Sequence, residues 1–377
     1  MIDFNSSSIN NIYLNDTNTN EQTNSSLMII VFKIISIIPL IIIFIGVTGN
    51  LTSFLIFRLE KELRQMSSMV YLSFCCITDT LSLFTWNLNH FLRPNFNFGT
   101  DELGIHYCRF FQFIQYFSLQ SSALILAAVC VDRYFSVIST PGSFISKLPF
   151  GTVKSATIIS SIIVTIIALS NSFILFTDRL EIYQNETIIY NNLTYFQHLP
   201  VKYDCDTLPN GYKIYPDYET VHIIIYPTLA VIIMFIFNTL LIIKIVSIKK
   251  SRSSSSNNNN NSNNKMINLT VSLLFITFLF VLMCLPGTFA YKYFGDYFYS
   301  TNELKAIIYS IDSLSFLNRS SIFINCMISN VKFRSTVLRK LNKLFRFSSN
   351  QNNYNNNNNR FKYQTETNYN NNNNTRM

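Results

Sequence analysis

Long apolar segments separated by short polar ones run through most of the chain. The hydrocarbon core of a bilayer requires roughly 20 consecutive apolar residues in a helix. Seven segments reach that length, at residues 28–57, 67–92, 107–131, 153–176, 219–246, 266–294 and 304–331. The pattern therefore predicts an all-α membrane protein whose fold is a bundle of seven transmembrane helices.

Charged residues are rare inside these segments, as a membrane location requires. Only 13% of the residues are charged and 49% are hydrophobic, so the chain holds about half the charge usual for a soluble domain. Three charged residues lie well inside a segment: Asp79 in the second, and Asp312 and Arg319 in the seventh. Because an ionised side chain at this depth costs several kcal/mol, each needs a partner or a function.

The basic residues predict the orientation of the bundle. Lysine and arginine accumulate in the first, third and fifth connections and after the last segment, whereas the first 27 residues contain neither. Because basic loops stay in the cytoplasm, the N-terminus is predicted to lie outside. The net charge of +9 then indicates orientation and attraction to anionic membrane lipid, and requires no nucleic acid partner.

The same reading divides the chain into four parts. Residues 1–27 are expected to form an extracellular glycosylated tail, residues 28–331 the transmembrane domain, residues 332–347 an amphipathic cytoplasmic helix, and residues 348–377 an Asn-rich cytoplasmic tail. The last tail and a Ser/Asn-rich insert at about 251–264 are predicted to be disordered, because they have little apolar surface to bury. The glycosylation sequons on the predicted outer side are Asn5, Asn15, Asn24, Asn185 and Asn192.

The predicted amphipathic helix follows the seventh segment directly. Its apolar positions form one stripe between basic residues, which suits a helix lying on the inner leaflet. The stripe consists of Phe333, Val337, Leu338, Leu341, Leu344 and Phe345.

The third segment carries marked residues at both ends. Cys108 opens it, and Asp132, Arg133 and Tyr134 follow its last apolar residue. The 25 residues from Cys108 to Arg133 correspond to about 37 Å of helix, which crosses the whole membrane.

On these residues the sequence resembles the rhodopsin-like (class A) G-protein-coupled receptors over about residues 28–346, and among them it is most similar to neuropeptide receptors. Further family marks follow in order: Asn50 in "GVTGN", Asp79 in "CCITDTLSL", Cys205 in the second outer loop, Pro227 in the fifth helix, and Phe280 and Pro286 in "FVLMCLP". The resemblance implies a receptor in the plasma membrane that binds an extracellular ligand and couples to a heterotrimeric G protein.

The resemblance also implies roles for particular residues. Cys108 and Cys205 face the oxidising side and would form a disulfide. The residues implied in activation and G-protein coupling are Asp132, Arg133, Tyr134, Phe235, Phe280 and Pro286.

Several positions depart from the family pattern. Phe235 replaces a tyrosine in the fifth helix, and Cys284 replaces a tryptophan two residues before Pro286. In the seventh helix, Ile322, Phe323 and Cys326 stand where the family has the named residues of Asn-Pro-x-x-Tyr. A receptor-like protein that binds ligand but no longer signals therefore remains an alternative.

A polar site is expected in the middle of the membrane. In the family, a sodium ion lies between the helix-two aspartate and polar groups of helices three and seven, and Asp79, Ser122 and Asn318 match those positions. Arg319 is adjacent to Asn318, and we expect its guanidinium to replace the ion in a bidentate pair with Asp79. The alternative partner is Asp312, two turns earlier on the same helix. Asn50 belongs to the same predicted site.

The expected ligand pocket lies between helices three, five, six and seven. The amine receptors of the family keep an aspartate where this chain has Gln115, so an amine transmitter is disfavoured and the pocket is predicted to be neutral and aromatic. Its candidate lining residues are Gln115, Tyr116, Leu119, Cys284, Thr288, Tyr291 and Tyr309. The long outer loop at about 178–218 carries Asp204, Asp206 and Asp217, which favours a peptide ligand with basic residues.

Other function classes find less support. The four histidines do not stand at metal-ligand spacing, and no metalloprotease or phosphate-loop motif is present, so neither an enzyme, a metal nor a cofactor is predicted. A transporter or channel remains the alternative from another class, because Asp79, Asp312 and Arg319 could line an ion path. The sequence shows no repeat between its halves, which disfavours a transporter.

Overall fold

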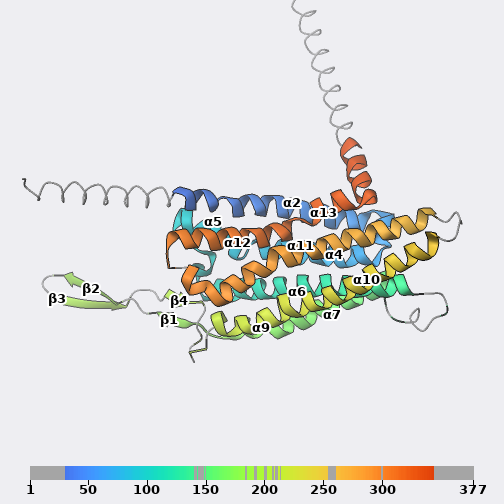
Figure 1. Ribbon diagram of the computed structural model, residues 1–377. Coiled ribbons are helices and arrows are strands. Elements are labelled where there is room, and N and C mark those ends of the chain that lie inside the picture. The colour runs from blue at the N-terminus through green and yellow to red at the C-terminus, as the bar shows by residue number, and fades with distance from the viewer. Residues whose placement is uncertain are drawn as a thin grey trace, which may run out of the picture.

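A computed structural model describes residues 30–139, 142, 148, 150–182, 185–190, 193–198, 202–205, 208, 211–212, 214–253, 260–298 and 300–343. Long helices run side by side and form one bundle (Figure 1). The strands lie beyond one end of the bundle, and the helix over residues 331–343 lies at the opposite end. The first end is the outer one and the second is the cytoplasmic one in the orientation predicted by the basic residues.

Seven helical segments make up the bundle. They are, in chain order, α2 (Ile38–Leu59), α4 (Ser67–Leu83) with α5 (Trp86–Phe96), α6 (Ile105–Ile138), α7 (Val153–Asn171) with α8 (Phe173–Phe176), α9 (Glu219–Ile223) with α10 (Ala230–Ser253), α11 (Asn260–Phe298), and α12 (Asn302–Ser320) with α13 (Ile322–Ser329). A π-helix at Ile224–Leu229 joins α9 to α10.

The connections contain short elements. On the cytoplasmic side, α3 (Lys61–Arg64) links α2 to α4. The outer elements are a 3-10 helix at Thr100–Leu103, strands β1 (Leu180–Ile182), β2 (Asn185–Tyr190), β3 (Leu193–His198) and β4 (Lys202–Asp204), and a π-helix at Ile214–Tyr218. Strands β2 and β3 form an antiparallel hairpin, and β1 pairs with β4 at its base.

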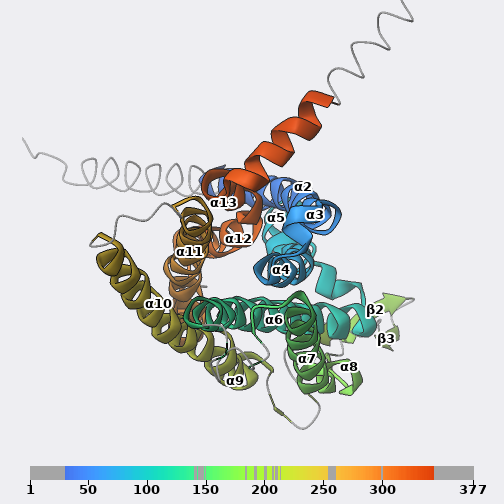
Figure 2. The same cartoon turned by 90° about the vertical axis from the view of Figure 1, so that its right-hand side faces the viewer.

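Six of the seven segments are long and apolar enough to cross a membrane by themselves. The seventh, α12 with α13, is less apolar because it carries Asp312 and Arg319, and it is interrupted at Ser321. It packs between α2 and α11, as the view along the bundle in Figure 2 shows. The structure thus has the all-α, seven-helix fold that the hydropathy pattern predicts.

Helix α6 lies at the centre of the bundle, in contact with α4, α7, α10 and α11. Several of its buried residues are small, among them Ala123, Ala127 and Cys130. Many large apolar side chains point away from the bundle, including Phe44, Phe176 and Phe278. An apolar outer surface around a partly polar interior is the arrangement expected of a protein surrounded by lipid.

The first and seventh segments approach each other closely at Gly46. A Cβ atom at this position would lie only 2.8 Å from the Cβ of Ser320. Glycine therefore allows α2 to contact α12, as small residues commonly do between membrane helices. This contact brings the polar middle of α12 against the rest of the bundle.

Helix α12 ends without a proline. The Ser321 hydroxyl donates to the carbonyl of Asn318 at 2.6 Å, and the Ser321 amide donates to the same carbonyl at 3.1 Å. Both bonds satisfy the carbonyl of Asn318, one of the last in α12, before α13 starts at Ile322. A serine therefore provides a helix break in the segment where the family motif has a proline.

Two predicted boundaries differ from the structure or extend beyond it. The insert expected to be disordered over 251–264 is helical at both of its ends, because α10 continues to Ser253 and α11 begins at Asn260. A formed helix adds residues at little further cost, so the membrane helices extend into this polar segment. The predicted amphipathic helix is helical over residues 331–343. Phe333 and Val337 of its stripe are buried against the bundle, whereas Leu338 and Leu341 are exposed.

Several predicted residues lie outside the described part of the chain. They are Asn5, Asn15, Asn24 and Asn192 of the glycosylation sequons, Asp206 of the outer loop, and Leu344 and Phe345 of the apolar stripe. Asn185 is the first residue of β2.

Candidate functional site

A cavity of about 300 Å³ opens in the outer half of the bundle. Six of the seven predicted pocket residues line it: Gln115, Tyr116, Leu119, Thr288, Tyr291 and Tyr309. The other lining residues are Trp86, His90, Arg93, Gln112, Glu219, His222, Tyr226, Asp312, Ser315 and Phe316. The volume is at the lower end of the range for small-molecule sites, and suits one or two side chains of a larger ligand.

Cys284 is the predicted pocket residue that the structure places elsewhere. Its side chain is fully buried below the cavity, where its sulfur accepts a hydrogen bond from Asn318 Nδ2 at 3.5 Å. A cysteine is too short to reach the space that the family's tryptophan would fill, so this position contributes to helix packing in the present chain.

The cavity is charged, which corrects the expectation of a neutral aromatic pocket. Arg93, Glu219 and Asp312 line it together with the aromatic residues. Tyr116 OH donates to Glu219 at 3.2 Å, and Tyr291 OH donates to Asp312 at 3.4 Å. The sequence prediction inferred the charge of the pocket from Gln115 on α6, whereas these charges come from α5, α9 and α12.

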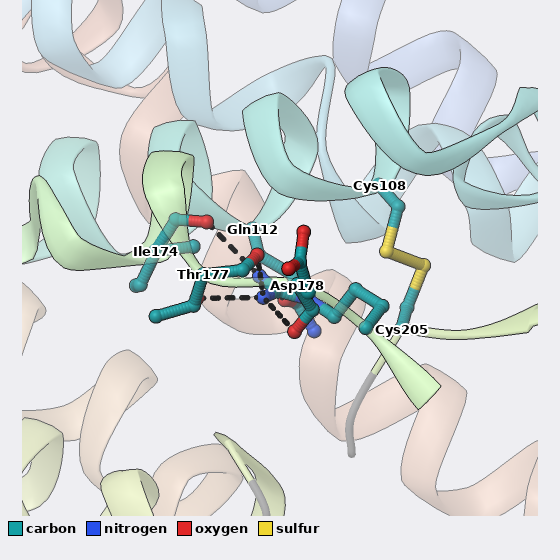
Figure 3. The surroundings of a disulfide bond; sticks show 7 residues. Cys108, Gln112, Ile174, Thr177, Asp178 and Cys205 are labelled. Carbon is teal, nitrogen blue, oxygen red and sulfur yellow. Dashed lines mark hydrogen bonds between the residues drawn. A yellow bond between two sulfur atoms is a disulfide. The ribbon is translucent and has the colours of Figure 1, made fainter. Parts of the chain in front are cut away.

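Two connections fix the outer loop above this cavity. A disulfide joins Cys108, at the outer end of α6, to Cys205, and their Cα atoms are 5.7 Å apart. Arg179 is buried nearby and donates to the Gln112 side chain at 3.0 Å and to the Ile174 carbonyl at 3.1 Å. Figure 3 shows this group of hydrogen bonds beside the disulfide. The loop is therefore held to α6 both covalently and through Gln112, a residue of the cavity wall.

A second polar group lies deeper, in the middle of the bundle. Arg319 is 1% exposed, and its Nη1 donates to Asp79 Oδ1 at 2.9 Å. Its Nη2 donates to the Tyr226 hydroxyl at 2.5 Å. The expected partner is therefore Asp79 rather than Asp312, but the pair is not bidentate. The guanidinium fork instead connects α4, α12 and the π-helix of the fifth segment.

The remaining residues of the predicted polar site surround this group. Asn50 Nδ2 donates to the carbonyl of Arg319 at 3.2 Å. Ser122 is buried on α6, and its carbonyl accepts from the Cys75 thiol at 3.9 Å. Asn318 is turned toward Cys284 on α11. The helical backbone thus brings all of the predicted residues to one depth, and Tyr226 is the member that the sequence did not reveal.

Comparison with known proteins agrees with this architecture. The sequence profile of the family described as "7 transmembrane receptor (rhodopsin family)" matches residues 49–329. This chain belongs to the rhodopsin family of seven-transmembrane receptors. No curated protein matches the sequence significantly.

Membership in the rhodopsin family establishes the general class and location of the protein. Proteins of the rhodopsin family are multi-pass receptors of the plasma membrane, they respond to extracellular ligands, and they act through G proteins rather than as enzymes. The alternative reading as a transporter or channel is therefore set aside. The subtype of receptor and its ligand are finer questions.

The cytoplasmic end of α6 carries a closed polar cluster in this rhodopsin-family receptor. Asp132 Oδ2 accepts from Arg133 Nη2 at 2.6 Å and from the Ser67 hydroxyl at 2.8 Å. Its Oδ1 accepts from the Gly151 amide at 2.7 Å. The Arg133 side chain also donates to Ser67. Asp132 thus holds Arg133 against α4 while it also fixes the connection that leads to α7.

Two aromatic residues implied in activation, Tyr134 and Phe280, lie at different depths of the bundle. The Tyr134 ring lies 5.6 Å from the ring of Phe237 on α10. Phe280 on α11 is buried and contacts Tyr226 edge to face at 5.9 Å. Pro286 lies within α11, two turns closer to the outer side.

Phe235, one of the residues implied in activation, does not lie in the interior of the bundle. Its side chain is 72% exposed on the outer surface of α10, whereas Met234 is buried. The π-helix around Pro227 has a wider turn than an α-helix and so rotates the residues that follow. The family position therefore marked a residue that faces outward in this structure, whereas the preceding residue, Met234, faces inward.

Proposed function

We propose that this rhodopsin-family receptor binds an extracellular peptide with the cavity at its outer end and activates a heterotrimeric G protein through the Arg133 cluster. The observation that supports coupling most directly is the buried contact of Asp132 with Arg133 and Ser67. A charged residue held at the cytoplasmic end of the central helix is available for release when neighbouring helices move. Because proteins of the rhodopsin family act through G proteins, the released arginine would be available to contact a G protein.

The outer surface supports a peptide as the ligand. The hairpin of β2 and β3 extends beyond the bundle (Figure 1), and strand edges are surfaces on which an extended peptide can form backbone hydrogen bonds. Desolvation and the Asp217 carboxylate raise the pKa of the Tyr212 phenol. Because Asp217 is exposed before α9, it adds negative charge close to the outer opening and favours basic residues in the peptide. The likeness to neuropeptide receptors is part of the same proposal.

The resting state is held by few contacts. Rhodopsin-like receptors often carry a glutamate at the foot of the sixth helix as a second clamp on the arginine, but the corresponding stretch here reads "NNKMINLT" and contains no acid. Asp132 is then the main anionic partner of Arg133, since the nearby acids pair elsewhere: Glu62 on α3 pairs with Lys332, and Glu60, just before α3, pairs with Arg339. Loss of Asp132 should release Arg133.

The first prediction tests coupling without any ligand. Asp132→Asn should raise basal nucleotide exchange several-fold, because a neutral amide attracts the guanidinium much less than a carboxylate does. The measurement is GTP-analogue binding to membranes that contain the receptor and purified G proteins of each class. Asp217→Asn is the matched control, since it removes an exposed acid far from the cytoplasm, and it should leave basal exchange unchanged.

The double variant separates coupling from binding alone. Asp132→Asn with Arg133→Ala should return exchange to the level of membranes without receptor, with the surface amount preserved. If Asp132→Asn leaves exchange unchanged with every class of G protein, coupling through this cluster is refuted. That result would favour the receptor that binds but does not signal, an alternative that the altered seventh helix raises because Ile322, Phe323 and Cys326 occupy the motif positions.

A further inference from the structure

The cavity contains more negative than positive charge. Of its charged lining residues, Glu219 and Asp312 are acids and Arg93 is a base, so the formal charge of the cavity is −1 when the two lining histidines are neutral. The state of His222 therefore matters for the ligand, and the buried hydrogen bonds around it determine that state.

Two buried amide side chains, those of Asn171 and Gln120, fix the position of the proton on His222. Asn171 Nδ2 donates to the Ile167 carbonyl at 2.8 Å, which identifies this atom as the nitrogen, and it also donates to Gln120 Oε1 at 2.8 Å. Tyr218 OH donates to Asn171 Oδ1 at 2.8 Å. Gln120 must then present Nε2, a donor, to His222 Nδ1 at 3.2 Å. Because Nδ1 accepts, the ring is neutral and its proton is on Nε2.

The Nε2–H group of His222 is available to a ligand. His222 lines the cavity, and the ring stacks on Tyr226 with centroids 5.0 Å apart. Within the described residues, Nε2 makes no hydrogen bond, and it is not among the buried atoms that lack a partner. The cavity wall therefore presents a hydrogen-bond donor here and no acceptor.

Asp312 on α12 provides a negatively charged hydrogen-bond acceptor in the same cavity. Its Oδ2 lies 3.3 Å from His90 Nδ1 and accepts from Tyr291. Among the described residues, no lysine or arginine forms an ion pair with it, and its Oδ1 has no hydrogen-bond partner. Arg319, seven residues later, is occupied by Asp79 and Tyr226. The carboxylate, 15% exposed, therefore faces the cavity without a cation to neutralise it.

We infer that Asp312 binds a cationic group of the ligand, an ammonium or a guanidinium, while His222 Nε2–H donates to a hydrogen-bond acceptor of the same ligand. This inference rests on the proposed ligand site and specifies the chemistry that the site recognises. The counter-ion that helix three lacks is thus supplied from α12. Gln115 does not replace it, since its amide oxygen already accepts from Thr85.

An anionic ligand group on Arg93 fits the cavity less well. The Arg93 guanidinium lies 5.6 Å from the centre of the Trp86 ring, in cation–π contact. An anion placed there would share a small cavity with two carboxylates, and charges of one sign repel strongly where water is scarce. A cation on Asp312 instead brings the formal charge of the cavity to zero.

The test uses small probes on the purified full-length receptor in lipid nanodiscs. The probes are N-acetyl-arginine amide, its neutral isostere N-acetyl-citrulline amide, and N-acetyl-glutamate amide, each at millimolar concentration. A probe that binds only the folded state raises the melting temperature with concentration. The arginine probe should raise it with at least tenfold higher apparent affinity than the citrulline probe. This comparison needs no variant and no G protein.

Variants then locate the two contacts. Asp312→Asn should abolish the preference for arginine over citrulline. Glu303→Gln, which removes an exposed acid from the first turn of the same helix but outside the cavity, should preserve it. His222→Phe keeps an aromatic ring on Tyr226 but removes the donor. It should make N-acetyl-arginine amide bind no better than butylguanidinium, which has the cation without carbonyl acceptors.

Three results would overturn the inference: equal effects of the arginine and citrulline probes, a larger effect of the glutamate probe, or no effect of any cationic probe at millimolar concentration. The nucleotide-exchange measurement is independent of these probes. Failure of ligand chemistry and failure of G-protein coupling are therefore distinguishable.

Discussion

Two arginines of this receptor are both paired with aspartate, yet they lie in different surroundings. Arg319 is 1% exposed in the middle of the bundle, and its acid, Asp79, comes from another helix. Arg133 is 12% exposed at the cytoplasmic end of α6, and its acid is the preceding residue, Asp132. The deep arginine connects three segments, whereas the cytoplasmic arginine contacts its own helix and Ser67 on α4.

This difference in surroundings predicts different behaviour. The Arg319–Asp79 pair should be structural, whereas the Arg133–Asp132 pair should be able to separate. A charge that leaves a buried partner has no water to reach, so the Arg319 pair should persist in every state of the receptor. Arg133 lies close to the cytoplasm, where water or a bound protein can replace its partner at lower cost. Under the proposed function, the same residue types therefore hold the bundle together in the middle of the membrane and act as a switch at its cytoplasmic end.

The largest effect is expected from breaking the deep pair. Asp79→Asn should leave Arg319 charged and without an anionic partner, which costs about 3–5 kcal/mol in a buried site. We expect little receptor at the cell surface, measured by labelling an N-terminal epitope. The double variant Asp79→Asn with Arg319→Gln should recover surface expression, because it removes both charges together. A double variant as poorly expressed as the single one would show that the pair does not exist.

A smaller loss is expected when the tyrosine of the same group is changed. Tyr226→Phe removes the hydroxyl that accepts from Arg319 Nη2 at 2.5 Å, and hydrogen bonds to charged groups contribute about 1.5–3 kcal/mol. Tyr218→Phe is the matched control, since it removes a buried bond to neutral Asn171, worth about 0.5–1.5 kcal/mol. The melting temperature of the purified receptor should fall further for Tyr226→Phe. The reverse order would show that Arg319 does not depend on Tyr226.

The cytoplasmic pair should respond in signalling rather than in stability. Ser67→Ala removes one hydroxyl that contacts both Asp132 and Arg133, at a cost of about 1 kcal/mol. Basal nucleotide exchange should rise modestly, by less than in Asp132→Asn. Ser68→Ala is a close control, because the neighbouring Ser68 hydroxyl is buried without a partner among the described residues. Equal exchange in the two serine variants would argue against a role of Ser67 in holding Arg133.

Sequence reasoning succeeded where a large energy left few options. Apolar segments of membrane length predicted the helices, and the cost of burying a charge predicted that Arg319 would find Asp79 across the bundle. The expected disulfide partners, Cys108 and Cys205, are joined in the structure. These features depend on two large energies, the burial of long apolar segments in the membrane and the desolvation of charged side chains. Both can be inferred from the residue types alone.

Sequence reasoning failed where the outcome depended on helix geometry. The π-helix around Pro227 turns Tyr226 inward and Phe235 outward, and no residue of that segment marks the extra residue in the turn. The charge of the cavity was missed because Glu219 and Asp312 lie on different helices and meet only after folding. Predicted contacts along one helix face were therefore more reliable than predicted positions after a change of helix type.

The last prediction concerns sodium, for which the smallest effect is expected. Arg319 Nη1 lies 2.9 Å from Asp79 Oδ1, so a sodium ion on this carboxylate would stand beside a second positive charge. At about 4 Å, two like charges repel by roughly 4 kcal/mol at an effective dielectric constant of 20.

The melting temperature should therefore be equal in sodium chloride and in potassium chloride of the same ionic strength. Arg319→Gln should make the melting temperature depend on sodium, because Asp79 then lacks a cation. Ser122 and Asn318 remain nearby and can supply oxygen ligands to the ion. We expect sodium, but not potassium, to stabilise that variant. A wild-type receptor stabilised by sodium would mean that the guanidinium does not occupy the place of the ion.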